Sequence, residues 1–266
     1  MNNVILSFND TSKISIDCRP TETILAAAAR QGISLASDCQ MGDCQTCRGK
    51  IVSGRVNYDL GSSLSLSDEE LSNSETLCCV AIPDGNLEIE LPYTRSSLLP
   101  AKDYVFTVSA IEYLTPNTVA VRGSLPATSK FNFHAGQYVK IQVGDAAQVR
   151  SYSMANSPHE GSLEFLIRIL PNGAMSPFLT HELKPGDKLR IRGPHGVFYL
   201  RENHAKKIMI AGGTGLAPII AMLRNMVHTQ STDTPILFCF VVNGPEEPFY
   251  LNELEALQEK FTVLDL

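Results

Sequence analysis

The sequence predicts a multidomain α+β protein with an acidic, cysteine-rich N-terminal part, an antiparallel β-barrel and a truncated doubly wound α/β part. Three observations predict this organisation. Residues 1–95 contain six of the seven cysteines and 13 Asp/Glu against 7 Lys/Arg, whereas residues 96–266 contain 15 of each charge. The middle of the chain is a series of short strand-like segments separated by Gly and Pro, which is typical of a barrel. Near the end, an apolar strand, a glycine-rich turn and a helix follow one another, as in doubly wound domains.

The composition excludes several classes of protein. With 266 residues, 44% hydrophobic and 19% charged, the chain has enough apolar surface to exclude intrinsic disorder. A net charge of −6 disfavours nucleic acid as a partner. The N-terminus lacks a secretory signal pattern, and the longest uncharged stretch, residues 208–223, is short for a membrane span. We therefore expect a soluble cytoplasmic protein without a membrane partner, whose cysteines serve metal or redox chemistry.

The N-terminal part contains four segments with a clear pattern. Residues 4–8 and 13–18 alternate like paired strands. Residues 21–32 predict a helix with an N-cap threonine, Glu22 in the first turn and a terminal glycine. Residues 49–56 and 87–91 predict further strands. The acidic surface of this part either only keeps it solvated or steers a basic docking partner toward it.

The cysteine spacing is the most specific motif. Cys39-x4-Cys44-x2-Cys47, followed by a distant cysteine, is the plant-type spacing of a [2Fe–2S] cluster held by four thiolates. Gly42 allows the loop to fold inward, so that its amides can face the cluster sulfurs. A structural zinc site is the alternative, but this segment has one Cys-x2-Cys and no His. Spacing alone leaves the fourth ligand open between Cys78 and Cys79.

The run Leu77-Cys78-Cys79-Val80-Ala81-Ile82-Pro83 resembles the last ligand segment of plant-type ferredoxins. The resemblance implies a β-grasp fold. It also implies a metal-ligand set of Cys39, Cys44, Cys47 and Cys79, with Cys78 as a small packing residue. Gln45 stands where many of these ferredoxins have Gly or Ser, and Asp43 adds a charge, so both are expected to alter the potential or stability of the cluster. Cys18 and Cys239 are expected to be core cysteines of strands.

The middle of the chain predicts an antiparallel barrel with strands at residues 105–111, 118–122, 138–143, 163–170 and 188–192. In Arg150-Ser151-Tyr152-Ser153, strand alternation places Arg150 and Tyr152 on one face. An Arg beside an aromatic ring can bind a phosphate and stack on a flat heterocycle. The alternative is a barrel-wall Tyr with a surface Arg. Residues 171–176 predict a glycine turn that leads into a helix ending at Leu183. The N-terminus of such a helix is a natural anion site.

Near the C-terminus, residues 208–211 predict a strand, Gly212-Gly213-Thr214-Gly215 a phosphate-binding turn, and residues 216–227 a helix. Residues 235–242 and 249–259 predict the next parallel strand and a second helix. A 2′-phosphate would favour an Arg or Lys near the end of that strand, but residues 225–259 contain neither, whereas Glu246 and Glu247 are acidic. The sequence therefore favours NADH over NADPH.

The order of these motifs, with Gly-Pro-His-Gly at 193–196, resembles the ferredoxin–NADP reductase superfamily. In that superfamily Arg150 would bind the flavin diphosphate, Tyr152 would pack on the isoalloxazine, and Ser153 would approach its N5. The candidate catalytic residues are Tyr152, Ser153 and Thr214. The candidate cofactor-binding residues are Arg150, Ser151, Tyr152 and Ser153, then Ile167, Arg168 and Ile169, then Gly173, Ala174, Met175 and Ser176 for the pyrophosphate, and Gly212, Gly213, Thr214 and Gly215.

The whole chain, including Tyr199-Leu200-Arg201 before the glycine turn, resembles the reductase components of bacterial aromatic-ring dioxygenases and related multicomponent monooxygenases. The resemblance implies a ferredoxin domain (1–95), an FAD domain (102–203) and an incomplete NAD domain (204–266). NADH would reduce FAD, and electrons would pass singly through the cluster to a terminal oxygenase or an intermediate ferredoxin.

Residues 261–266 predict a third parallel strand, beyond which relatives continue with a Cys-Gly-Pro segment and a closing aromatic. We therefore expect a fragment. Two alternatives follow from the resemblance and the chain end. One is an electron shuttle without NADH activity of its own, and the other is a reductase for a different oxygenase or a deoxysugar dehydratase.

Overall fold

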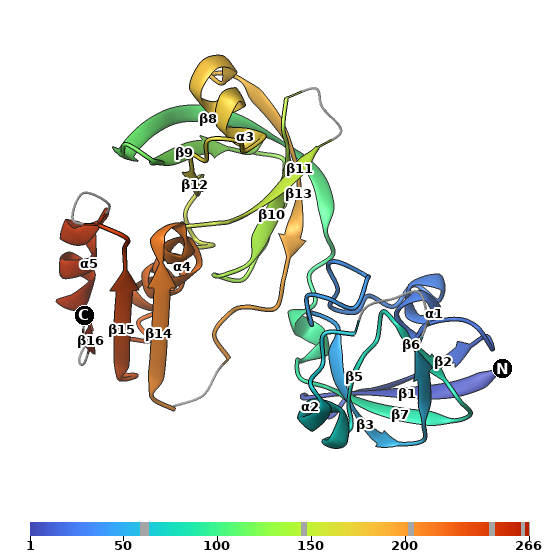
Figure 1. Cartoon of the computed structure of the whole chain (residues 1–266). Helices are drawn as coiled ribbons and strands as arrows, with labels where there is room; N and C mark the ends of the chain where they lie inside the picture. The colour runs from blue at the N-terminus through green and yellow to red at the C-terminus, as the bar shows by residue number, and fades with distance from the viewer. Residues whose placement is uncertain (59–63, 145–147, 202–204, 245–247, 262–263, 266) are drawn as a thin grey trace. The chain divides into compact units, whose positions relative to one another are not determined.

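The computed structural model describes residues 1–266 except 59–63, 145–147, 202–204, 245–247, 262–263 and 266. The chain forms two compact units, Met1–Pro100 and Ala101–Leu266 (Figure 1). No helix within the described ranges is both long and apolar enough to cross a membrane.

The N-terminal unit is built on a mixed five-stranded sheet in the order β2-β1-β7-β3-β5. β1 pairs antiparallel with β2 and parallel with β7, which is the arrangement of a β-grasp fold. Helix α1 buries Ile24, Ala27 and Ala28. The elements are β1 (Asn2–Phe8), β2 (Lys13–Cys18), α1 (Ile24–Arg30), β3 (Arg48–Ser53), β4 (Val56–Tyr58), α2 (Asp68–Ser72), β5 (Glu75–Leu77), β6 (Ala81–Pro83), β7 (Leu87–Leu91) and a 3-10 turn, η1 (Arg95–Ser97).

Two predicted boundaries in this unit are wrong. The helix is shorter than 21–32, because Thr23 is its N-cap and accepts a hydrogen bond from the Ala26 N–H at 3.3 Å. Glu22 therefore precedes the helix, where it forms an ion pair with Arg30 at 2.8 Å. The predicted strand 49–56 divides into β3 and β4, since Gly54 turns the chain with a φ of +92°.

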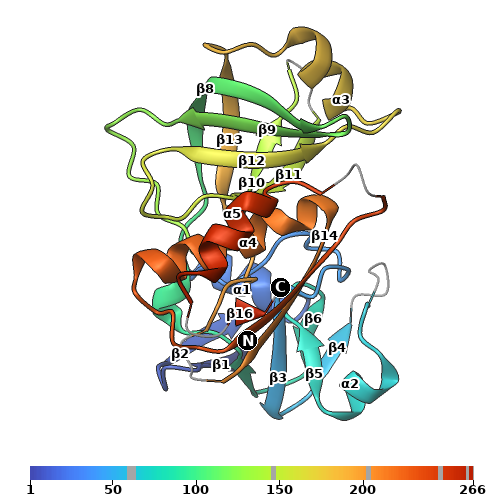
Figure 2. The same cartoon turned by 90° about the vertical axis from the view of Figure 1, so that its left-hand side faces the viewer.

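The second unit begins with a six-stranded antiparallel barrel in the order β11-β10-β13-β8-β9-β12 (Figure 2). A bridge between Met154 and Phe165 joins the two end strands, and these residues lie in the barrel core with Phe106 and Ile141. The five strands predicted for this part are confirmed, with shifted ends. The elements are β8 (Lys102–Thr115), β9 (Thr118–Ser124), β10 (Tyr138–Gln142), β11 (Val149–Ser153), β12 (Leu163–Arg168), α3 (Met175–Pro177), the π-helical turn η2 (Phe178–Glu182) and β13 (Lys188–His195).

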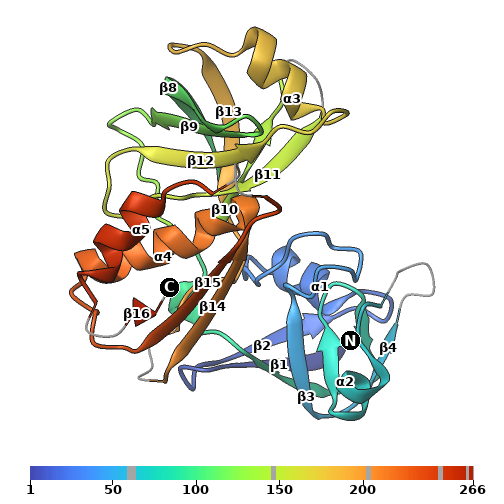
Figure 3. The same cartoon turned by 60° about the vertical axis from the view of Figure 1, so that its left-hand side comes forward.

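The barrel is followed by a parallel sheet in the order β14-β15-β16, with α4 and α5 along one face (Figure 3). Met209, Ala211, Ile236 and Phe238 of the sheet are buried in one apolar cluster with α4. The elements are β14 (Lys207–Gly212), the 3-10 turn η3 (Gly213–Gly215), α4 (Leu216–His228), β15 (Ile236–Val241), α5 (Leu251–Gln258) and β16 (Leu264–Asp265). The strand–turn–helix unit predicted here is confirmed.

The prediction that Cys239 is a core residue is wrong. It lies in β15 as expected, but strand alternation places it on the face away from α4 and α5, where it is exposed. The same face of β14 and β15 also exposes four aliphatic side chains, Ile208, Ile210, Leu237 and Val241, at 71%, 69%, 45% and 57%. Cys18 and Cys78, by contrast, are buried, as predicted.

Accordingly, iodoacetamide should alkylate Cys239 in the native protein within minutes. Cys18 and Cys78, at 0% and 1% exposure, should react only after unfolding. Peptide mapping by mass spectrometry after timed quenching measures the three rates in one sample. Equal protection of Cys239 and Cys18 would contradict the exposed position of Cys239.

Candidate functional site

The predicted cysteine ligands lie on the loop between α1 and β3 and on the turn after β5. Their sulfurs form two pairs. In the first pair, Cys44 N–H donates to Cys39 Sγ at 3.4 Å, and Cys39 N–H donates to Cys44 Sγ at 3.5 Å. In the second, the thiols of Cys47 and Cys79 are hydrogen-bonded to each other, and Gly42 N–H donates to Cys79. The loop thus supplies three of the four sulfurs, and its Cys47 pairs with Cys79 from the distant turn after β5.

Backbone N–H groups favour the thiolate at these sulfurs. Burial raises the pKa of Cys39, but the N–H groups of Met41 and Cys44 outweigh it and lower the pKa overall. The hydrogen bond from Cys47, with that of Gly42 N–H, lowers the pKa of Cys79 to about 7. The pKa of Cys47 is raised by the same contact with Cys79 and by burial. Two of the four thiols are therefore held toward the form that binds iron.

The paired arrangement suits a binuclear cluster, because such a cluster divides four thiolates between two iron atoms. A tetrahedral zinc site would instead gather all four donors around one ion. The donor set and its geometry thus fit a [2Fe–2S] cluster held by Cys39, Cys44, Cys47 and Cys79.

The contacts of Gln45 show how this position holds a residue other than the Gly or Ser of many ferredoxins. Its φ is +55°, a left-handed conformation that glycine adopts without strain. Two side-chain contacts hold it there, because its amide donates to Ser65 O at 2.7 Å and accepts from Arg48 Nη1 at 3.2 Å. Arg48 in turn forms ion pairs with Glu70 at 2.6 Å and Glu75 at 3.1 Å. Sequence reasoning missed this support of the cysteine loop, since its members are far apart along the chain.

The predicted flavin motif lies on β11, an end strand of the barrel sheet. Arg150 is exposed and donates to the carbonyl of Val149 at 2.9 Å. Tyr152 is half-buried and packs against the barrel core. Burial raises the pKa of Tyr152 to about 12, although the charge of Arg150 opposes the shift. Both residues lie on one face of the strand, while Ser151 is exposed and Ser153 half-buried.

The glycine turn at residues 173–176 is tightly built. Ser176 Oγ accepts a hydrogen bond from Leu170 N–H at 2.8 Å, and a Cβ on Gly173 would lie 3.0 Å from that oxygen. Gly173 and Ala174 are half-buried, whereas the side chain of Met175 is buried in the barrel core. The helix predicted to reach Leu183 is instead the short α3 followed by the π-helical turn η2.

The predicted cofactor-binding residues at the end of β12 point to opposite sides of the strand. Ile167 is buried in the barrel core, and Ile169 packs against it. Arg168 points to the other side, where its Nη1 lies 3.7 Å from the position that a Cβ on Gly213 would occupy. Gly212 ends β14, and Gly213, with a φ of +50°, opens the turn through Thr214 and Gly215 into α4. The structure thus brings a predicted flavin-binding residue to the predicted nucleotide turn. Glu246 and Glu247, which favour NADH, lie outside the described residues.

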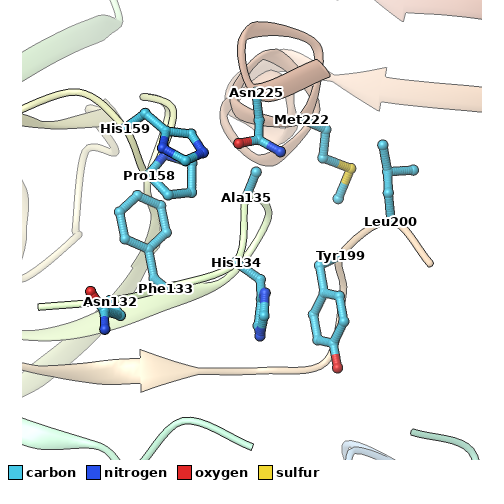
Figure 4. A pocket seen from close by; sticks show the side chains of 10 residues that line it. All are labelled: Asn132, Phe133, His134, Ala135, Pro158, His159, Tyr199, Leu200, Met222 and Asn225. Carbon is cyan, nitrogen blue, oxygen red and sulfur yellow. The ribbon is translucent and has the colours of Figure 1, made fainter. Parts of the chain in front are cut away.

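A cavity of about 390 Å³ lies between the barrel loops and α4 (Figure 4). The rings of His134 and Tyr199 stack beside it with centroids 4.6 Å apart, and His159, Met222 and Asn225 also line it. None of the predicted cofactor residues borders this cavity. Met222 is six residues beyond Leu216, so the cavity begins about 9 Å along α4 from the glycine turn.

A β-grasp unit with four paired cysteines, a barrel with Arg-x-Tyr-Ser and a parallel sheet with a glycine turn define an iron–sulfur flavoprotein of the ferredoxin-reductase type. Family comparisons agree with this class. Residues 7–84 match the 2Fe-2S iron-sulfur cluster binding domain, residues 105–199 the oxidoreductase FAD-binding domain, and residues 209–264 the oxidoreductase NAD-binding domain.

Individual relatives narrow the class. The chain is 35% identical to the xylene/toluene monooxygenase electron transfer component of Pseudomonas putida, over 89% of this chain and 67% of that protein. It is also 35% identical to the toluate 1,2-dioxygenase electron transfer component of the same organism, over 95% and 76%. The crystal structure of an Amycolatopsis cytochrome P450 reductase aligns with a TM-score of 0.68 at 27% identity, over 98% of this chain and 79% of that one. The chain belongs to the family of oxygenase electron-transfer components.

Proposed function

We propose that this chain accepts electrons from NADH and passes them, through FAD and a [2Fe–2S] cluster, to a terminal oxygenase or an intermediate ferredoxin. The observation that carries the proposal is the succession of three cofactor-binding domains in one chain. The relatives named above are electron-transfer components of oxygenases. The domain limits that we propose, 1–95, 102–203 and 204–266, contain the three family matches.

The roles of the chain's own residues follow from their positions. FAD, when bound, supplies the conversion of a two-electron hydride donor into single electrons. Arg150 provides an exposed positive charge for its phosphates, and Tyr152 provides a ring on the same strand face. The turn Gly212–Gly215 presents backbone N–H groups to the dinucleotide. The four thiolates hold the cluster, with N–H groups offsetting their charge.

The partner is proposed as a class. The relatives include components of a monooxygenase for xylene and toluene, a dioxygenase for toluate and a propane 2-monooxygenase. Related chains therefore serve oxygenases with different substrates, as expected if the substrate is bound by the oxygenase. NADH is favoured as the donor because residues 225–259 contain no Lys or Arg for a 2′-phosphate.

An anaerobic titration of the purified chain with NADH, followed by absorbance, tests this function. We expect both the flavin and the cluster bands to bleach, and NADPH to require higher concentrations. Bands that respond only to dithionite would replace the proposal with an electron shuttle that lacks NADH activity. A colourless preparation that contains zinc would overturn both.

Replacing Tyr152 by alanine should weaken FAD binding by about two- to tenfold, because an aromatic stacking contact contributes about 0.5–1.5 kcal/mol. Tyr152→Phe keeps the ring and should keep the affinity. Fluorescence titration of the flavin-free protein measures both values, and the cluster absorbance reports that the N-terminal unit is intact. Equal affinity in wild type and Tyr152→Ala would remove the flavin assignment of this residue.

A further inference from the structure

Strand β12 separates two cores of the second unit. Leu163, Phe165 and Ile167 point into the barrel core. The alternate residues face the nucleotide part, since Leu166 is 3% exposed and belongs to the apolar cluster that contains most of α4. The polar residues on this second face, Glu164 and Arg168, stand at the two ends of the strand. The contact between barrel and nucleotide part is therefore apolar in the middle and charged at both ends.

Glu164 is 5% exposed, and three donors from other elements reach its carboxylate. Oε1 accepts from Arg122 Nε on β9 at 2.6 Å and from the Tyr250 hydroxyl at 2.8 Å. Oε2 accepts from Arg224 Nη1 on α4 at 2.6 Å. Burial raises the pKa of Glu164, but Arg224, Tyr250 and Arg122 outweigh it and hold the pKa below its usual range. The buried carboxylate thus stays charged.

Arg224 extends the contact to α5 and back to the barrel. Its Nε and Nη2 donate to the carboxylate of Glu253 on α5 at 2.6 and 2.9 Å. Its Nη1 also donates to the carbonyl of Ala155 at 2.8 Å. Tyr250 is the N-cap of α5 and has a φ of +58°. One guanidinium therefore joins the barrel, α4 and α5 with four hydrogen bonds, a geometry that lysine cannot reproduce.

The two ends of β12 set the register of α4. Glu164 and Arg168 are four residues apart, or about 13 Å along a strand. On the nucleotide side, Arg168 approaches Gly213, at the start of the turn that leads into α4, and Arg224 lies eleven residues further along the chain. Arg168 meets the glycine turn at one end, and Glu164 meets Arg224 at the other. A slip of α4 by one turn, about 5.4 Å, would break the Arg224–Glu164 pair.

We infer that Glu164, Arg224 and Tyr250 are positioning residues, which hold α4 along β12 and thereby place the turn Gly212–Gly215 beside Arg168, the proposed cofactor-binding residue at the end of β12. The inference rests on the proposed function, because it concerns the alignment of NADH with FAD. A displacement of α4 that separated Arg224 from Glu164 would leave a buried charge without its partner, which is costly. Reactant alignment is sensitive to such shifts, since a displacement of about 1 Å can lower a rate about a hundredfold.

Stopped-flow reduction of the flavin by NADH in Arg224→Lys and Tyr250→Phe tests the inference. We expect the limiting rate to fall about tenfold or more in Arg224→Lys and by a smaller factor in Tyr250→Phe, with FAD content and cluster absorbance unchanged. Arg192→Lys is the matched control, because Arg192 pairs with Asp103 on the exposed barrel surface at 2.7 Å. Unchanged limiting rates in both folded variants would overturn the inference, as would a fall in thermal stability alone.

A second measurement separates this inference from the proposed function. Hydrogen exchange in peptides that contain residues 212–215 should be faster in Arg224→Lys and Tyr250→Phe than in wild type and Arg192→Lys. If wild type is not reduced by NADH, the proposed function fails, but exchange at the glycine turn still decides whether the network positions it. Unchanged exchange at this turn in both variants would overturn the positioning role.

Discussion

Replacing Cys79 by serine should abolish the iron–sulfur cluster, whereas replacing its neighbour Cys78 by alanine should leave it in place. The two cysteines are adjacent, yet only Cys79 pairs with Cys47 and receives the Gly42 N–H. Cys78 is 1% exposed, and burial raises its pKa to about 12, which suits a packing residue. We therefore expect complete loss of the cluster bands in Cys79→Ser, and a loss of only about 1 kcal/mol of folding free energy in Cys78→Ala.

Iron and acid-labile sulfide analysis of both variants measures this difference directly. Cys39→Ser should also lose the cluster, because Cys39 is a proposed ligand in the other sulfur pair. Flavin reduction by NADH should persist in all three variants, since the flavin motif lies in a separate compact unit. If Cys78→Ala lost the cluster while Cys79→Ser kept it, the ligand assignment would be reversed.

Replacing Arg150 by alanine should weaken FAD binding by about ten- to a hundredfold. A hydrogen bond to a charged group contributes about 1.5–3 kcal/mol, and Arg150 offers a planar, doubly donating group for a phosphate. The side chain is exposed and donates to the adjacent carbonyl of Val149, so its removal should leave the barrel folded. Arg150→Lys keeps the charge without the paired donors, and it should bind FAD with intermediate affinity.

Isothermal titration of the flavin-free protein gives the three dissociation constants, and far-ultraviolet circular dichroism checks the fold. Raising the salt concentration should reduce the difference between wild type and Arg150→Ala, because exposed charges are screened. Equal FAD affinity in the three proteins would show that Arg150 does not bind the FAD phosphates.

Much of the fold could be predicted because the decisive signals are local. Strand alternation located β1, β2, β7 and the barrel strands, and the cysteine spacing located the ligand loop. The errors arose where local pattern leaves a choice. Thr21 and Thr23 both qualify as an N-cap, and the observed hydrogen bond selects Thr23. Alternation shows that Cys239 faces away from Phe238, but only the position of α4 and α5 shows which face is covered.

The sequence by itself indicated the kinds of cofactor, through the cysteine spacing and through the resemblance of Arg-x-Tyr-Ser and the glycine turn to ferredoxin–NADP reductases, because these motifs are patterns of residue type along the chain. The tertiary structure decided how these pieces meet. Arg224 and Glu164 are 60 residues apart, and Gln45 contacts a carbonyl 20 residues away. Such pairings depend on which faces of strands and helices pack together. A buried charge finds its partner only when packing brings both elements to one place.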